Sequence, residues 1–61
     1  MNKTFKDYIT RQVAAIRSML SSLREATINT LGYGNAAELG SVLFDAINAL
    51  IDFEIILEKI N

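Results

Sequence analysis

The stretch Gly32-Tyr33-Gly34-Asn35 decides the fold, because it is the only dense group of helix-breaking residues in a 61-residue chain without proline. Glycine just after a helix and asparagine just before one are recognised stop and start signals. Thr4 and Asn35 each stand three positions before an acidic residue, which is the spacing of a capping box. The sequence therefore predicts a helix over residues 4–31, a turn at 32–35 and a second helix over 36–60.

Apolar residues recur along both predicted helices at alternating steps of three and four. This repeat of 3.5 residues is typical of helices that pack side by side at a small crossing angle. Because the turn is short, the two helices must be antiparallel neighbours. We expect an all-α fold, an antiparallel two-helix hairpin that forms a single domain over residues 1–61. The two seams are Ile9, Val13, Ile16, Leu20, Leu23, Thr27 and Thr30 in the first helix, and Leu39, Leu43, Ala46, Leu50, Phe53, Leu57 and Ile60 in the second.

The second helix carries a further apolar face, made of Phe44, Ile47, Ile51 and Ile55. A lone hairpin would leave this face in water, although burial of each of these side chains is worth roughly 1.5–3 kcal/mol. A domain of this size also buries only about 60% of its unfolded surface, so its own core is small. We expect the hairpin to self-associate through this face into a four-helix bundle or a larger helical oligomer. The alternative is a docking groove for a different protein.

Charge is divided unequally between the two halves. Residues 1–31 hold five basic and two acidic side chains (+3), whereas residues 32–61 hold one basic and five acidic (−4). If the chain folds back at the turn, residues whose numbers sum to 69 lie level, so Arg24 faces Asp45 and Arg17 faces Asp52. We expect these pairs to set the register of the hairpin. The alternative is a basic face and an acidic face for partners of opposite charge.

The composition leaves little room for chemistry. The chain has no cysteine and no histidine, which excludes disulfides, thiol nucleophiles and histidine-based sites. Glu54 and Glu58 have helical spacing, but no further ligand stands near them. We expect no enzymatic activity, no cofactor and no metal site. Charged residues interrupt the most apolar stretch, 46–57, well before the ~20 residues that a membrane span needs. Lys3, Lys6 and Asp7 precede any apolar run, so we expect no signal peptide. We therefore expect a cytoplasmic protein without membrane contact.

By elimination, the sequence favours stoichiometric binding, as an adaptor, inhibitor or regulator of another macromolecule, such as a bacterial, plasmid or phage accessory protein. The layout resembles the plasmid copy-number regulator Rop in architecture, without a shared motif, so the resemblance implies no residue role. Expected partners are a second copy first and another protein next. The alternative is an oligomeric binder of an anionic, phosphate-bearing ligand, a nucleotide or RNA. Its contacts would lie in the basic start of the first helix, at Lys3, Lys6, Tyr8 and Arg11.

Overall fold

The computed structural model describes residues 1–60 and contains one α-helix, α1 (Lys3–Glu58). The all-α prediction is therefore confirmed. Asn61, the last residue of the predicted domain, lies outside the described residues.

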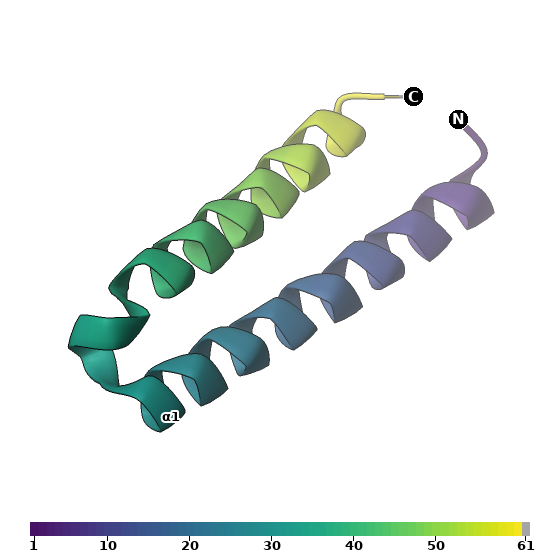
Figure 1. The fold of residues 1–61 in the computed structure, drawn as a ribbon. Helices are drawn as coiled ribbons and strands as arrows, with labels where there is room; N and C mark the ends of the chain where they lie inside the picture. Colours follow the sequence, from purple (N-terminus) through teal and green to yellow (C-terminus); the bar gives the residue numbers. More distant parts are fainter. Residues whose placement is uncertain (61) are drawn as a thin grey trace.

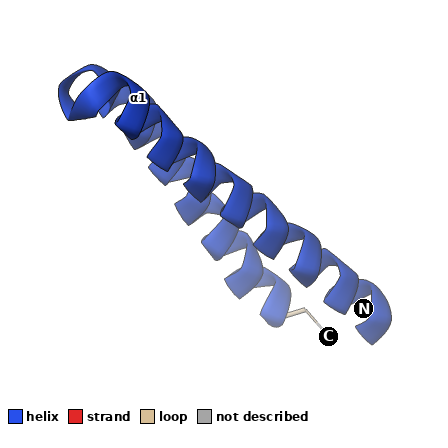
Figure 2. Cartoon of the chain, turned by 90° about the horizontal axis from the view of Figure 1, so that it is seen from below, coloured by secondary structure: helices blue, strands red, loops and turns tan. Residues whose placement is uncertain are grey.

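A single residue interrupts α1. Gly32 has φ 80° and ψ 158°, and it is the one position within the helix with non-helical angles. A straight helix of 56 residues would be about 84 Å long at 1.5 Å per residue, yet the longest extent of the Cα trace is 44 Å. The chain turns back at Gly32, and the segments before and after it, the first arm (residues 3–31) and the second arm (residues 33–58), run antiparallel side by side (Figures 1 and 2).

The ends of the arms differ from the predicted ones. The cap of the first arm is Asn2 rather than Thr4, since the Asn2 Oδ1 accepts hydrogen bonds from the backbone N–H of Thr4 (2.8 Å) and Phe5 (3.2 Å). Asn35 does not cap the second arm. It lies within the helix and its Nδ2 donates to the carbonyl oxygen of Leu31 at 3.2 Å.

The turn is consequently shorter than expected, and the second arm begins earlier than expected. Residues 33–35 keep a helical backbone, so the break occupies one position instead of four. The second arm ends at Glu58, and Lys59 is its C-cap, with its backbone N–H donating to Ile56 and Leu57. Glycine alone reaches the dihedral angles of this break without strain.

Contact between the arms uses only half of each seam. The buried apolar residues are Val13, Ala36 and Leu57, at 5%, 1% and 4% exposure. The heptad series 13, 20, 27 and 43, 50, 57 are buried or partly buried between the arms. In contrast, the seam residues exposed by more than 40% are Ile16, Leu23, Leu39, Phe53 and Ile60.

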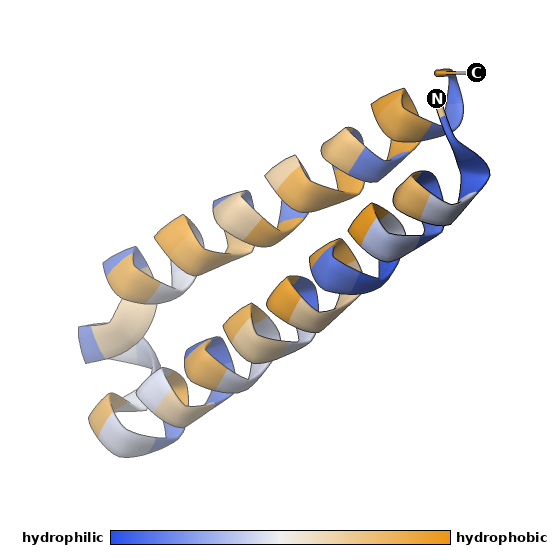
Figure 3. Cartoon of the chain, turned by 90° about the vertical axis from the view of Figure 1, so that its right-hand side faces the viewer, coloured by the Kyte–Doolittle hydropathy of each residue, from blue (hydrophilic) through white to orange (hydrophobic). Residues whose placement is uncertain are grey.

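The result is an unusually open surface. The chain exposes 4580 Å², whereas a compact monomer of 6.8 kDa would expose about 4,000 Å². Apolar residues run along the full length of both arms (Figure 3). One pair of arms therefore leaves a large part of the apolar surface uncovered.

Candidate interaction surface

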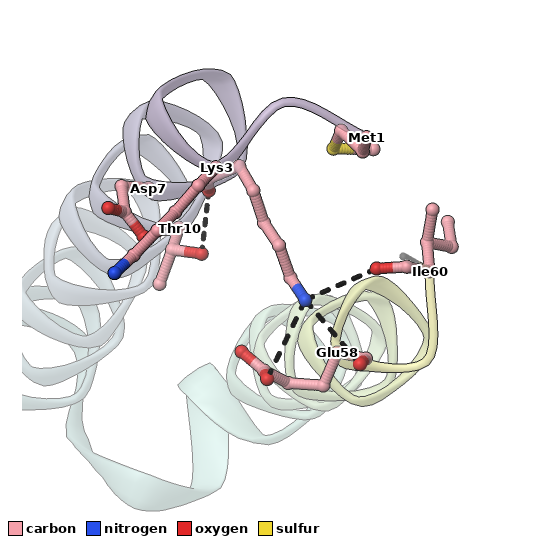
Figure 4. Close-up of a pocket in the computed structure, with 7 residues that line it drawn as sticks. Met1, Lys3, Asp7, Thr10, Glu58 and Ile60 are labelled. Atoms are coloured by element: carbon pink, nitrogen blue, oxygen red, sulfur yellow. Dashed lines mark hydrogen bonds and ion pairs between the residues drawn. The ribbon is translucent and has the colours of Figure 1, made fainter.

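Basic side chains of the first arm cross to the second arm on one side of the molecule, which we call the ion-paired side. Arg17 Nη1 lies 3.4 Å from Glu54 Oε2 and donates a hydrogen bond to it. At the open end, Lys6 Nζ lies 3.8 Å from Glu58 Oε2 and also donates to the backbone oxygens of Glu58 (3.5 Å) and Ile60 (3.3 Å) (Figure 4). This lysine thus neutralises the carbonyl end of α1, where a cation is favoured by the helix dipole.

Arg24 makes the third crossing, near the turn. Its Nε donates to the carbonyl oxygen of Gly40 at 3.2 Å, and its Cζ lies 5.6 Å from the centre of the Phe44 ring, within cation–π range. Gly40 is buried, and a Cβ atom built on it would stand 3.8 Å from Arg24 Nε. The crossing therefore combines a hydrogen bond, an aromatic contact and close packing on one guanidinium.

The predicted register pairs are wrong in their partners. Arg17 pairs with Glu54 instead of Asp52, and Arg24 bonds a backbone carbonyl instead of Asp45. Residues whose numbers sum to 69 lie at about the same position along the two arms, but this rule does not say in which direction each side chain points. Asp52 follows Leu50 by two residues, a rotation of about 200°, so it points away from the first arm.

The ion pair of Glu54 with Arg17 was not predicted, although the spacing of Glu54 indicates that it faces the first arm. It stands four residues after Leu50 and three before Leu57, which places it on the contact stripe of the second arm. Its Oε1 atom is buried and, within residues 1–60, has no hydrogen-bond partner. The same spacing argument applies to Lys6, three residues before Ile9.

The opposite side of the molecule, which we call the apolar side, has a different character. A shallow hollow between Ala26, Thr27 and Thr30 of the first arm and Leu39 of the second shows that these residues share one side. Residues seven positions apart on a helix point almost the same way, which extends this side along both arms. Its large exposed members are Phe5, Ile16, Met19, Leu23, Leu39, Val42, Phe53, Ile56 and Ile60.

The interface residues predicted from the sequence lie on the ion-paired side. Phe44, Ile51 and Ile55 are exposed by 51%, 37% and 51% and form an apolar strip along the second arm, while Ile47 is partly buried beside it. The Arg24 contact with Phe44 fixes the side. Exposed Asp45 and Asp52 follow the outer border of this apolar strip and, among the described residues, neither has an ion-pair partner.

The residues predicted to hold an anionic ligand do not come together. Lys6 is turned toward the second arm and engaged by Glu58, whereas Tyr8, two residues later, projects about 200° away and is half exposed. Arg11 shares the outer face with Tyr8. The hollow at the open end is lined by Lys3 and Lys6 but also by Asp7 and Glu58 (Figure 4), so its charges are mixed.

Other kinds of site are not found in the part of the chain that the structure describes. Residues 1–60 contain no group of three acidic side chains that could hold a metal ion. Glu54 and Glu58, the pair with helical spacing, are each engaged by a basic side chain. Within the same residues, no helix has the length and apolar character needed to cross a membrane.

Comparison with known proteins adds no relative. No protein-family model matches the chain, and no curated protein or solved structure matches it significantly. The interaction surfaces described above therefore carry the functional argument.

Proposed function

We propose that this chain is a non-catalytic helical hairpin that acts by stoichiometric binding. Two copies pair through their apolar sides to form a four-helix bundle. The apolar strip on the ion-paired side stays available in that dimer and binds another protein, so that the dimer acts as an adaptor, inhibitor or regulator.

The observation that carries the proposal is the division of each seam by heptad position. One series of each seam, such as 13, 20 and 27, faces the other arm, while the companion series includes the exposed residues Ile16 and Leu23 in the first arm and Leu39 and Phe53 in the second. Both series are buried when four helices surround a common axis. The surface in excess of a compact monomer, about 600 Å², is close to the ~800 Å² per partner of a standard interface.

The apolar strip supports the second half of the proposal. Phe44, Ile51 and Ile55 project on the side that a partner copy would not cover, next to two carboxylates without a cation of their own chain. An amphipathic helix with an apolar stripe and a basic edge would match this surface. We assign the strip to such a partner.

Light scattering on a sizing column tests the self-association. The wild-type chain should give about twice its mass of 6.8 kDa at micromolar concentration, and Phe53→Asp should give a monomer. Asn48→Asp adds the same charge to the same arm outside the apolar side and should remain a dimer. A wild-type chain that stays folded and monomeric at every concentration would refute the dimer.

Variants on the two surfaces then test the assignment of the strip. In co-purification with a binding partner, Ile51→Asp should lose the partner and keep the dimer mass, while Arg11→Ala should retain both. A partner that instead requires Arg11 and weakens steeply with salt would be a nucleic acid or nucleotide, and the assignment would be wrong.

A further inference from the structure

The distribution of charge bears on how the two copies are arranged. Each arm has its own sign, with +3 in residues 1–31 and −4 in residues 32–61. Only two ion pairs join the arms within residues 1–60, those of Lys6 and Arg17. Three carboxylates of the second arm are left without a basic partner: Glu38, Asp45 and Asp52.

These three carboxylates form an acidic edge that borders the apolar side. Glu38 and Asp45 flank Val42, being four residues before it and three after it, and Asp52 precedes Ile56 by four. Residues at these spacings are neighbours on a helix surface. When a second copy covers the apolar side, the acidic edge therefore lies next to whichever arm of that copy is placed above it.

Two symmetric arrangements bring apolar sides face to face. With the two-fold axis perpendicular to the arms, the turns lie at opposite ends and each second arm meets the partner's second arm. The two acidic edges then adjoin and six carboxylates share one border of the bundle. With the axis parallel to the arms, the turns lie at the same end, and each second arm meets the basic first arm of the partner.

We infer that the occupant of the apolar side is a second copy whose turn lies at the same end of the bundle, which keeps the acidic edges of the two copies apart. Like charges repel across neighbouring arms about 10 Å apart. This arrangement keeps the two acidic edges on different borders of the bundle, so electrostatic repulsion favours it over the opposite-end arrangement. The inference rests on the proposed self-association and adds the direction of the partner.

Distances between spin labels on the full-length chain test the inference. Because the chain has no native cysteine, one introduced cysteine gives one labelling site per copy. Tyr33→Cys places a label at the turn, where the native side chain is 80% exposed. Same-end packing should give a label distance close to the width of a bundle, about 20–30 Å. Opposite-end packing would separate the labels by more than the 44 Å length of the Cα trace.

Ser18→Cys provides the matched control, because this exposed residue lies near the middle of the first arm. Its label should give a distance set by the bundle width in either arrangement. A short distance at both positions supports the inference. A short distance for Ser18→Cys with a long one for Tyr33→Cys overturns the arrangement and leaves the dimer intact, while no intermolecular distance at either position refutes the self-association itself.

Discussion

The two sides of this molecule are built from the same pair of arms, yet they differ in the contacts that join those arms. On the ion-paired side, Lys6, Arg17 and Arg24 span the gap and satisfy acceptors of the second arm. On the apolar side, no hydrogen bond or ion pair joins the arms within residues 1–60, and the exposed groups are large aliphatic and aromatic side chains.

The difference teaches where stability must come from. Partly exposed ion pairs contribute about 0.2–1 kcal/mol each, which aligns two arms but adds little to the free energy of folding. Burial of large apolar side chains contributes several times more, and most such groups here remain exposed. The ion-paired side therefore aligns the two arms, whereas the apolar side leaves most of its large side chains exposed.

The largest expected effect comes from introducing the same charge on each side in turn. Ile16 on the apolar side and Ile51 on the ion-paired side are matched in type and in exposure, 41% and 37%. In the proposed dimer, Ile16→Asp would remove two buried side chains, roughly 3–6 kcal/mol, so the dimer dissociation constant should rise 100-fold or more. Ile51→Asp should change it little; sedimentation equilibrium measures both, and equal losses would erase the distinction between the sides.

The break between the arms should give the next largest effect, since both sides depend on it. Gly32→Ala forces a side chain into dihedral angles that cost about 1–3 kcal/mol, and the unfolding free energy should fall by that amount. Gly34 lies two residues later in helical backbone, and a Cβ atom added to it would meet open space. Gly34→Ala should therefore raise the unfolding free energy by about 0.5–1 kcal/mol. Urea unfolding at one fixed protein concentration compares them, and a neutral Gly32→Ala would show that the turn is not strained.

On the ion-paired side the expected effect is smaller. Glu54→Gln keeps the shape of the side chain and removes the charge that faces Arg17, so it should lower the unfolding free energy by about 0.5–1 kcal/mol at low salt and by less at high salt. Asp52→Asn removes the same charge from the opposite face of the arm and serves as the control. A greater loss for Asp52→Asn would restore the register expected from the sequence.

The smallest expected effect is a small increase in stability from a substitution at the Arg24 crossing. Gly40 lies in helical backbone, and its added Cβ would meet Arg24 and Ile28 at 3.8–4.0 Å, an ordinary contact distance. Gly40→Ala should therefore stabilise the fold by up to about 1 kcal/mol through helix propensity, visible as a higher midpoint of thermal unfolding. A lower midpoint would mean that the guanidinium cannot keep its bond to the Gly40 carbonyl oxygen.

Sequence periodicity was sufficient for the helical fold. The glycine-rich stretch 32–35 contained the break, but the sequence did not single out Gly32 within it. The alternation of three and four residues identified both seams, because burial imposes this spacing on any packed helix. The same pattern could not say which half of a seam faces the neighbouring arm. Val13 and Ile16 are equally apolar, and only the geometry of the pair buries one and exposes the other.

The polar contacts were harder to predict, for a different reason. Charge counting found the opposite signs of the arms, but it matched residues by height and so chose Asp52 over Glu54. Projection on a helical wheel would have corrected that pair. The Arg24 contact with the Gly40 carbonyl was beyond such reasoning, because it depends on a backbone atom that a missing side chain uncovers.

The single-residue break at Gly32 also makes this chain a candidate for domain exchange. If the two dihedral angles of that residue became helical, the arms would join into one continuous rod of about 84 Å. Two such rods could exchange second arms and rebuild the contacts of Val13 and Leu57 between chains. The exchanged and closed forms would then differ in energy mainly through the conformation of residue 32. Concentrated stocks should therefore accumulate an elongated exchanged form, and substitutions that relax residue 32 into a helix should make that form persist after dilution.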